Sequence, residues 1–191
     1  MQKMRKMLFL IVLGLALVGA GCGVLGSSDK DKDYLHDSEA LALRVEALEK
    51  KVGGTLRVLD LSVVNDRGRE REINIISLYF VDPKNPGKSG RILYDAQNTN
   101  VPVLPGEMSF GTKDGFTLSE FDLRIVPKFV EQAEEAAKQQ GWSYFKDEEL
   151  RVRRDSESGE IRLRLVIKSE KESGKTLLVD GDSAGRVVGI R

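Results

Sequence analysis

Apolar residues along this chain recur with two different periods, and the two periods predict helices and strands in a fixed order. Between positions 41 and 52 an apolar residue returns every three or four positions, which is one face of an α-helix. Asp37 or Ser38 can cap the start of this helix, and Gly53-Gly54 ends it. The apolar face could pair with a second copy in a coiled coil. Fewer than three heptads favour a helix lying on its own sheet.

After this helix the apolar period changes to two, which predicts strands separated by polar turns. The phase of the alternation changes between Ile75 and Ile76, which indicates a β-bulge or a strand buried on both faces. Pro102 and Pro105 restrict the last strand to an edge. The expected strands are 55–65, 70–81, 91–95 and a short piece at 101–103.

A second helix and a second set of strands are predicted in the C-terminal half. Pro127 suits the first turn of a helix, and Gly141 ends the apolar face that follows it. Trp142, Tyr144 and Phe145 come next; they form either a binding patch or a lid on the core, and the large apolar area of aromatic rings favours the lid. The expected strands are 150–153, 161–168, 175–180 and 186–190.

Both halves therefore have the order helix, glycine, strand, turn, strand, turn, strand. We expect an α+β fold of two related units, each a helix laid across an antiparallel meander. Helix-plus-meander arrangements are also common in unrelated proteins, so the alternative is a chance match. The predicted segments are a signal peptide at 1–21, a lipidated cysteine and flexible tether at 22–37, a first unit at 38–105, a linker at 106–117 and a second unit at 118–191.

The first 21 residues predict export from the cytoplasm. A basic start precedes about 14 uncharged residues at 7–20, which is the order of a secretory signal peptide. A spanning helix needs about 20 apolar residues, so this segment is short for a transmembrane anchor. Extension as far as Leu25 gives a marginal span, and an uncleaved anchor is an alternative.

Cys22 is the single cysteine, and it closes the apolar run in the order Gly19-Ala20-Gly21-Cys22. This run resembles the bacterial lipobox. The resemblance implies cleavage between Gly21 and Cys22 and a diacylglyceryl group, with palmitate-type chains, on the Cys22 sulfur. Such a lipid would hold the protein on the cell membrane or outer membrane, facing away from the cytoplasm. Family lipoboxes usually carry Leu where this chain has Gly19, and cleavage by an ordinary signal peptidase after Ala20 is the alternative.

Composition and charge limit the functions that the exported part can have. The chain has 30 basic and 30 acidic residues, and its first 21 residues hold three basic and no acidic ones, so the remainder carries a charge near −3. The chain therefore lacks the excess of positive charge that would indicate nucleic-acid binding. No paired histidines, nucleophile elbow or phosphate loop occurs in the sequence, so we expect no enzyme, cofactor or metal. The single histidine, His36, is expected on the surface of the tether.

Two further motifs are candidate sites. The stretch 180–185 is similar to the start of an EF-hand calcium loop, but Arg191 stands where the loop needs Glu, so a simple turn is expected. Arg151, Arg153, Arg162 and Arg164 should share the outward face of one hairpin, with Arg154 and Lys168 nearby. Clustered guanidinium groups favour an anion, which could be a lipid phosphate, a cell-wall polymer or an acidic partner protein. The alternative is neutralisation by nearby acids, namely Glu148, Glu149, Glu157, Glu160 or those of the helix.

The second half resembles the PepSY module of bacterial envelope proteins. The likeness lies in a helix at 127–141 and a closing hairpin at 177–190, with 92–104 as a fainter echo. It implies inhibition or regulation of secreted peptidases. We expect a non-enzymatic function in which the exported part binds or regulates a partner at the cell envelope, through its sheet face or its arginine hairpin. Secreted β-lactamase-inhibitor proteins have a similar helix-on-sheet architecture but carry disulfides. This chain has a single cysteine and cannot form an intramolecular disulfide. The alternative function is a carrier that holds a lipidic or anionic ligand between helix and sheet.

Overall fold

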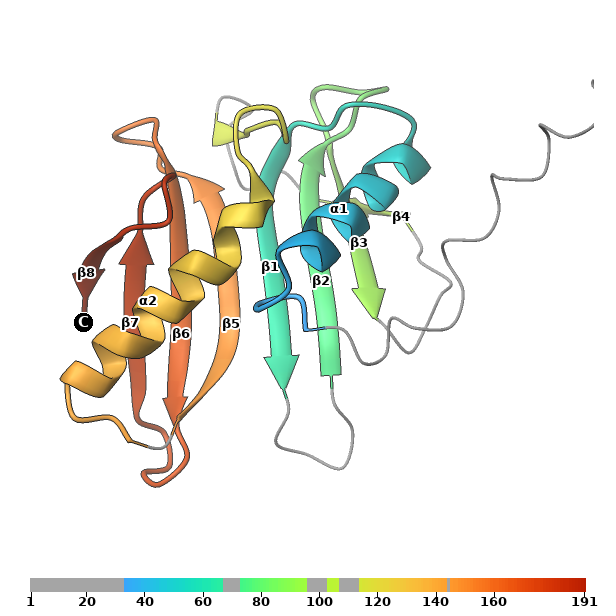
Figure 1. Ribbon diagram of the computed structural model, residues 1–191. Coiled ribbons are helices and arrows are strands. Elements are labelled where there is room, and N and C mark those ends of the chain that lie inside the picture. The colour runs from blue at the N-terminus through green and yellow to red at the C-terminus, as the bar shows by residue number, and fades with distance from the viewer. Residues whose placement is uncertain (1–32, 67–72, 96–102, 107–113, 144) are drawn as a thin grey trace, which may run out of the picture.

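The computed structural model describes residues 33–66, 73–95, 103–106, 114–143 and 145–191 (Figure 1). The predicted signal peptide, the cleavage position at Gly21, the lipidation position at Cys22 and the tether as far as residue 32 lie outside the described residues. Among the helices of the described part, none has the length and apolar character needed to cross a membrane.

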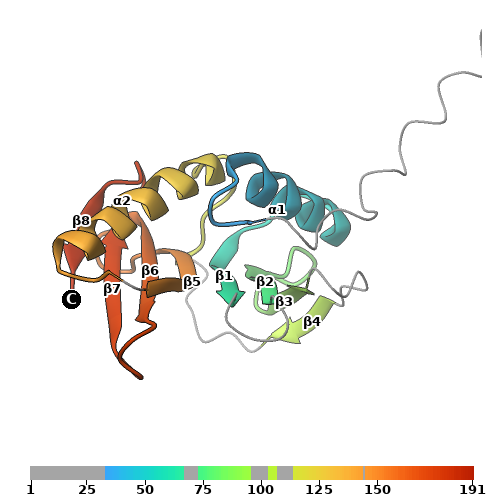
Figure 2. The ribbon, with the colours of Figure 1, turned by 60° about the horizontal axis from the view of Figure 1, so that its bottom comes forward.

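The described strands form one antiparallel sheet in the order β4-β3-β2-β1-β5-β6-β7-β8. Both helices lie on the same face of this sheet, α1 over the first four strands and α2 over the last four (Figures 1 and 2). No helix of the described residues lies on the opposite face, which we call the open face. The fold is therefore α+β, as expected. The helices are α1 (Ser38–Val52) and α2 (Val126–Gln139), with a 3-10 turn η3 (Leu123–Ile125) before α2. The strands are β1 (Val58–Asp66), β2 (Ile73–Val81), β3 (Ser89–Asp95), β4 (Val103–Gly106), β5 (Phe145–Arg154), β6 (Ile161–Ser169), β7 (Thr176–Gly181) and β8 (Val187–Ile190).

Helix α1 begins and ends at the predicted residues for local reasons. Asp37 Oδ1 accepts hydrogen bonds from the backbone N–H groups of Glu39 and Ala40, each at 3.0 Å, so Asp37 is the N-cap. Gly53 takes the left-handed conformation (φ 107°) that ends the helix. Arg44 is buried on the inner face, with its guanidinium 4.5 Å from the ring centre of Tyr94 in β3. The helix therefore lies on the sheet of its own chain.

Local residues also set the start and the end of helix α2, which covers the other half of the sheet. Pro127 occupies its first turn, where a missing N–H costs nothing, and Gly141 (φ 84°) follows its end. Phe129 is fully buried on the inner face. Trp142 and Phe145 are half-buried against the core, which confirms the lid for these two residues. Tyr144 lies outside the described residues.

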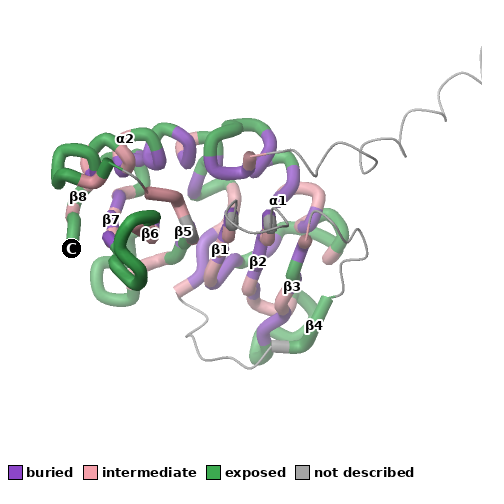
Figure 3. The backbone as a smooth tube through the Cα atoms, turned by 90° about the horizontal axis from the view of Figure 1, so that it is seen from below, coloured by how far each residue is buried: buried purple, intermediate pink, exposed green. Residues whose placement is uncertain are grey.

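The core lies between the helices and the sheet. Buried positions follow the inner faces of the helices and the strands beneath them (Figure 3). Two core residues, Tyr34 and Leu35, are 1% and 0% exposed and belong to the end of the predicted tether. The folded part therefore starts before Ser38, because these side chains are large and apolar and pack with the core.

Strands β1 and β5 join the two halves into one sheet. They pair antiparallel over four residues, from Leu61 opposite Val152 to Val64 opposite Glu149. Each half contributes one helix followed by four strands, and the strand order is symmetric about this β1–β5 seam.

The bulge predicted near Ile75 and Ile76 is wrong in position. The β1–β2 pairing runs without a shift from Asp60 opposite Tyr79 to Asp66 opposite Ile73. Ile76 is fully buried on the helix side of the sheet, whereas its neighbour Ile75 lies on the open face and is half-buried. The apolar alternation therefore changes phase here because β2 is partly buried on both faces. Register shifts lie instead in β1, next to Asp60, in β5, between Asp147 and Glu149, and in the β7–β8 pair, between Asp180 and Gly181.

Candidate functional site on the open sheet face

The four arginines of the β5–β6 hairpin form two direct cross-strand pairs. Arg151 lies opposite Arg164, and Arg153 lies opposite Arg162. The residues between them, such as Val152, are fully buried under the helices. Because side chains alternate along a strand, all four guanidinium groups project from the open face. This is the shared face that the alternation predicts; binding through it stays a prediction.

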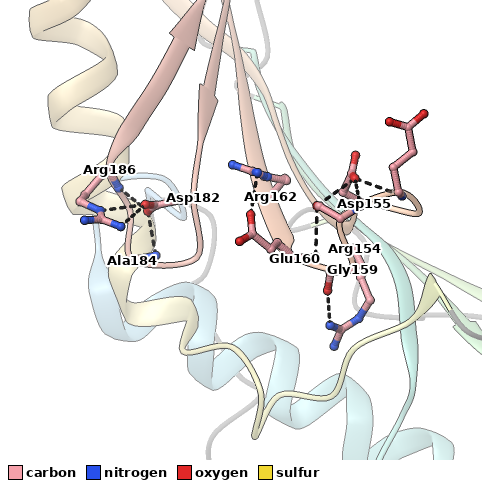
Figure 4. Close-up of polar contacts among 10 residues, drawn as sticks. Arg154, Asp155, Gly159, Glu160, Arg162, Asp182, Ala184 and Arg186 are labelled. Carbon is pink, nitrogen blue, oxygen red and sulfur yellow. Dashed lines mark hydrogen bonds and ion pairs between the residues drawn. The ribbon is translucent and has the colours of Figure 1, made fainter.

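Carboxylates neutralise three of these arginines. Glu149 and Glu160, which were expected as partners, accept at 2.8 and 2.6 Å; Figure 4 shows the second contact. The third partner is Asp180 of β7, which lies directly opposite Arg164 of β6. The sequence alone did not identify it, because this contact depends on the pairing of β6 with β7. The side chain of Glu148 is not described. The ion pairs are Arg151–Glu149, Arg162–Glu160 and Arg164–Asp180, the last at 2.7 Å.

Arg153 differs from the other three arginines. It is exposed and makes no hydrogen bond or ion pair with any described residue. It interacts electrostatically with Asp60 of β1, across the seam. Burial raises the pKa of the Asp60 carboxyl, while Arg151 and Arg153 lower it in part. Asp60 Oδ1 is buried without a hydrogen-bond partner among the described residues.

A hollow of about 440 Å³ lies over this part of the open face. It combines charged groups of both signs with apolar side chains, including Leu178 of β7 and the exposed Val188 of β8. Such a mixture of guanidinium groups and apolar area is typical of protein interfaces. Its other lining residues are Glu149, Arg151, Arg153, Asp155, Arg162, Leu163, Arg164, Val166, Asp180 and Gly189.

Arg154 and Lys168 do not join this arginine cluster. Arg154 pairs with the buried Ile161, so its side chain lies on the helix side of the sheet. There it donates to the carbonyl oxygens of Gly115 (3.1 Å) and Gly159 (2.6 Å), the second shown in Figure 4, and its Nη2 lies 2.6 Å from a Glu120 oxygen. Lys168 lies opposite Lys146, at the other end of the hairpin.

The stretch similar to a calcium loop is the expected turn. Asp182 Oδ1 accepts hydrogen bonds from the backbone N–H groups of Ala184 (2.9 Å) and Arg186 (3.0 Å). Its Oδ2 accepts from the Arg186 guanidinium at 2.7 Å (Figure 4). Both oxygens of Asp182 therefore hold the β7–β8 turn together.

A second polar cluster lies on the helix side of the sheet, and sequence reasoning did not find it. His36 Nδ1 is 2.8 Å from Asp33 Oδ2, and His36 Nε2 is 3.1 Å from Glu134 Oε1 of α2 and 3.7 Å from Asp147 Oδ2 of β5. His36 is half-exposed, as a surface histidine would be, but it is held by three acids. No spacing along the chain signals these contacts, because Glu134 and Asp147 come from the other half.

The cluster shifts the pKa values of its members. Burial, with the adjacent Glu134 as the second cause, raises the pKa of Asp147 to about 7, and His36 opposes this. The hydrogen bond to Asp33 is the main cause that raises the pKa of His36 to about 9, against the effect of burial.

Comparison with known proteins gives one likeness in fold. No protein-family model matches the chain, and no curated protein matches it. A crystal structure from Clostridium difficile 630, described as that of "a putative lipoprotein", is similar over 85% of this chain and 96% of that chain, with a TM-score of 0.51 and 14% sequence identity. At this identity the likeness shows a common fold. The resemblance to PepSY modules stays a prediction.

Proposed function

We propose that this chain is an envelope lipoprotein whose folded part binds an acidic partner protein through its open sheet face, without catalysing a reaction. The lipobox-like run that ends at Cys22 supports the lipid anchor. The description of the structurally similar Clostridium protein as a lipoprotein agrees with it. The lipid would hold the protein on the cell membrane or outer membrane.

The two cross-strand arginine pairs are the observation that carries the binding function. Like charges placed directly opposite one another destabilise a sheet, and within the described residues carboxylates pair with only three of these four guanidinium groups. Carboxylates that form bidentate pairs with guanidinium groups would stabilise them. Arg153 has no such carboxylate among the described residues, so it is the position at which a partner's acid gains most.

A protein partner fits this face better than a small ligand carried in the interior. The open face carries exposed apolar side chains: Val188 lines the hollow with the arginines, and Leu93 lies on β3, farther along the sheet. A carrier would hold its ligand between the helices and the sheet, where buried side chains of the core lie. The observations therefore favour the binding module over the carrier.

The same arrangement supports a description as two related units. Each half has one helix and four strands, and the halves meet symmetrically at the β1–β5 seam. If the C-terminal half is a PepSY-like module, the acidic partner would be a secreted peptidase that this protein regulates. This narrower version rests on the sequence resemblance alone.

The lipid anchor is tested with a Cys22→Ser variant in the bacterial envelope. We expect the wild-type protein to separate with membranes and to carry a lipid on its N-terminal cysteine by mass spectrometry. The variant should lose the lipid and leave the membrane fraction. A variant that is cleaved yet still separates with membranes would overturn the anchor.

The binding face is tested by reversing its charge. The double variant Arg153→Glu/Arg162→Glu should bind immobilised poly-glutamate at least about tenfold more weakly than wild type, since each charge-assisted hydrogen bond contributes about 1.5–3 kcal/mol. The control, Lys128→Glu/Lys138→Glu, makes the same charge change on exposed positions of α2. If both variants lost poly-glutamate affinity equally, net charge alone would explain the loss, and the assignment of binding to the open face would be wrong.

A further inference from the structure

The polar cluster around His36 has the composition and spacing of a metal site. It lies on the helix side of the sheet, separate from the arginine face, and brings together a turn before α1, the middle of α2 and strand β5. The β5 register shift between Asp147 and Glu149 makes this possible. Glu149 lies on the open face, whereas Asp147 lies opposite the buried Ile167 and therefore turns toward the helices.

We propose that His36, Glu134 and Asp147 bind a divalent transition-metal ion of the zinc class. Their ligand atoms all lie within 4.8 Å of one another. Metal–ligand bonds of 2.0–2.2 Å place neighbouring ligand atoms of a tetrahedral zinc ion about 3.3–3.6 Å apart. The two distances from His36 Nε2, 3.1 Å to Glu134 and 3.7 Å to Asp147, fall on either side of this value. Small side-chain movements would admit the ion.

Asp33 prepares the histidine for this role. It holds His36 Nδ1 at 2.8 Å, so Nε2 is the nitrogen that faces Glu134 and Asp147. A carboxylate behind the ring is the usual outer partner of a metal-bound histidine, because it fixes the ring and makes the nitrogen more basic. Asp33 is therefore a positioning residue for the proposed ion.

Asp147 supplies an observation that is independent of the spacing of the ligand atoms. Its side chain is only 7% exposed, and its Oδ1 is buried without a hydrogen-bond partner among the described residues. A buried carboxylate oxygen without a partner is costly, and a bound cation would compensate it. His36 and Glu134 are 36% and 27% exposed, so an ion can reach the cluster from solvent.

The ligand set selects the class of ion. One imidazole nitrogen and two carboxylate oxygens suit Zn²⁺ and similar transition metals, whereas Mg²⁺ and Ca²⁺ prefer oxygen ligands alone. Three protein ligands leave a fourth position for water or for a group from another molecule.

The test is titration of the full-length protein, purified without a histidine tag because His36 is the single histidine. We expect Co²⁺, used as a spectroscopic substitute for Zn²⁺, to give visible absorption bands of a tetrahedral site, and Zn²⁺ to displace it. His36→Gln should abolish the bands. Glu134→Gln and Asp147→Asn should weaken Zn²⁺ binding more than tenfold, and Asp33→Asn by about 10–100-fold.

The matched control is Glu131→Gln, which removes an exposed carboxylate one turn earlier on α2. It should bind Zn²⁺ as tightly as wild type. Zn²⁺ should also raise the melting temperature of wild type and of this control, but not of His36→Gln. Failure of wild type to bind Co²⁺ or Zn²⁺ would overturn the proposal. Unchanged affinity in Glu134→Gln would also overturn it, and this variant decides the matter if His36→Gln does not fold.

Discussion

Gly181 at the end of β7 lies directly against the ring of Phe129 on α2, and a Cβ atom at this position would be 2.4 Å from Phe129 Cε2. Phe129 is fully buried, so its ring cannot move aside without displacing the core. We expect Gly181→Ala to reduce the free energy of unfolding by about 1–3 kcal/mol, measured by urea denaturation. Gly189→Ala is the control, because its Cβ would meet nothing closer than 3.9 Å. Equal effects of the two substitutions would contradict the assignment to this contact.

Arg154 joins three separate segments on the helix side of the sheet. Its guanidinium contacts Gly115 and Glu120 before α2, and Gly159 in the β5–β6 turn. Arg154→Ala would leave two carbonyl oxygens without this donor, so we expect a loss of about 1.5–3 kcal/mol in the free energy of unfolding. The neighbouring exposed Arg153→Ala should change it by less than about 0.5 kcal/mol. A similar loss in both variants would argue against this role.

Asp60 is expected to make stability depend on pH. Burial raises the pKa of Asp60 in the folded state above the ordinary 3.8 of the unfolded state. At pH values between the unfolded-state and folded-state pKa, the folded state therefore holds more protons than the unfolded state. Its contribution to the free energy of unfolding therefore falls as pH rises through that window. Asp60→Asn removes this contribution, and the variant should gain stability relative to wild type as pH increases from about 4. Thermal denaturation of both proteins across this pH range is the measurement; a constant difference would contradict the expectation.

Asp37 caps α1, a role that the sequence left open between Asp37 and Ser38. Its Oδ1 accepts from two of the first N–H groups of the helix. Asp37→Ala should reduce the free energy of unfolding by about 1 kcal/mol, and Ser38→Ala should have little effect. Denaturant titration of the two variants distinguishes them, and the opposite order would assign the cap to Ser38.

Local signals predicted the elements well because their causes are local. The helix at 38–52 follows from its apolar spacing and its glycine stop, and the strand pattern of β6 follows from alternation. The arginine face could also be predicted, since one hairpin register places Arg151 and Arg153 on the same side. These residues depend only on neighbours close along the chain.

Relationships between the two halves could not be predicted in this way. The seam between β1 and β5 depends on which strand edges meet, and the sequence carries no mark of that choice. The bulge in β5, which turns Asp147 toward His36, is one added residue in an otherwise regular alternation. The buried Tyr34 was missed because the charged residues before it are typical of a tether.

The β1–β5 seam also sets the order in which the chain can fold. All other strand pairs join consecutive strands, so they close short loops. The seam instead brings together Ser62 and Glu149, which are 87 positions apart and hydrogen-bonded at 2.7 Å. Closing a loop of that length costs about 4 kcal/mol of chain entropy before its contacts form, so each meander should form first and their union should be the slow step. Pulse-labelled hydrogen exchange should show late protection along the facing edges of β1 and β5.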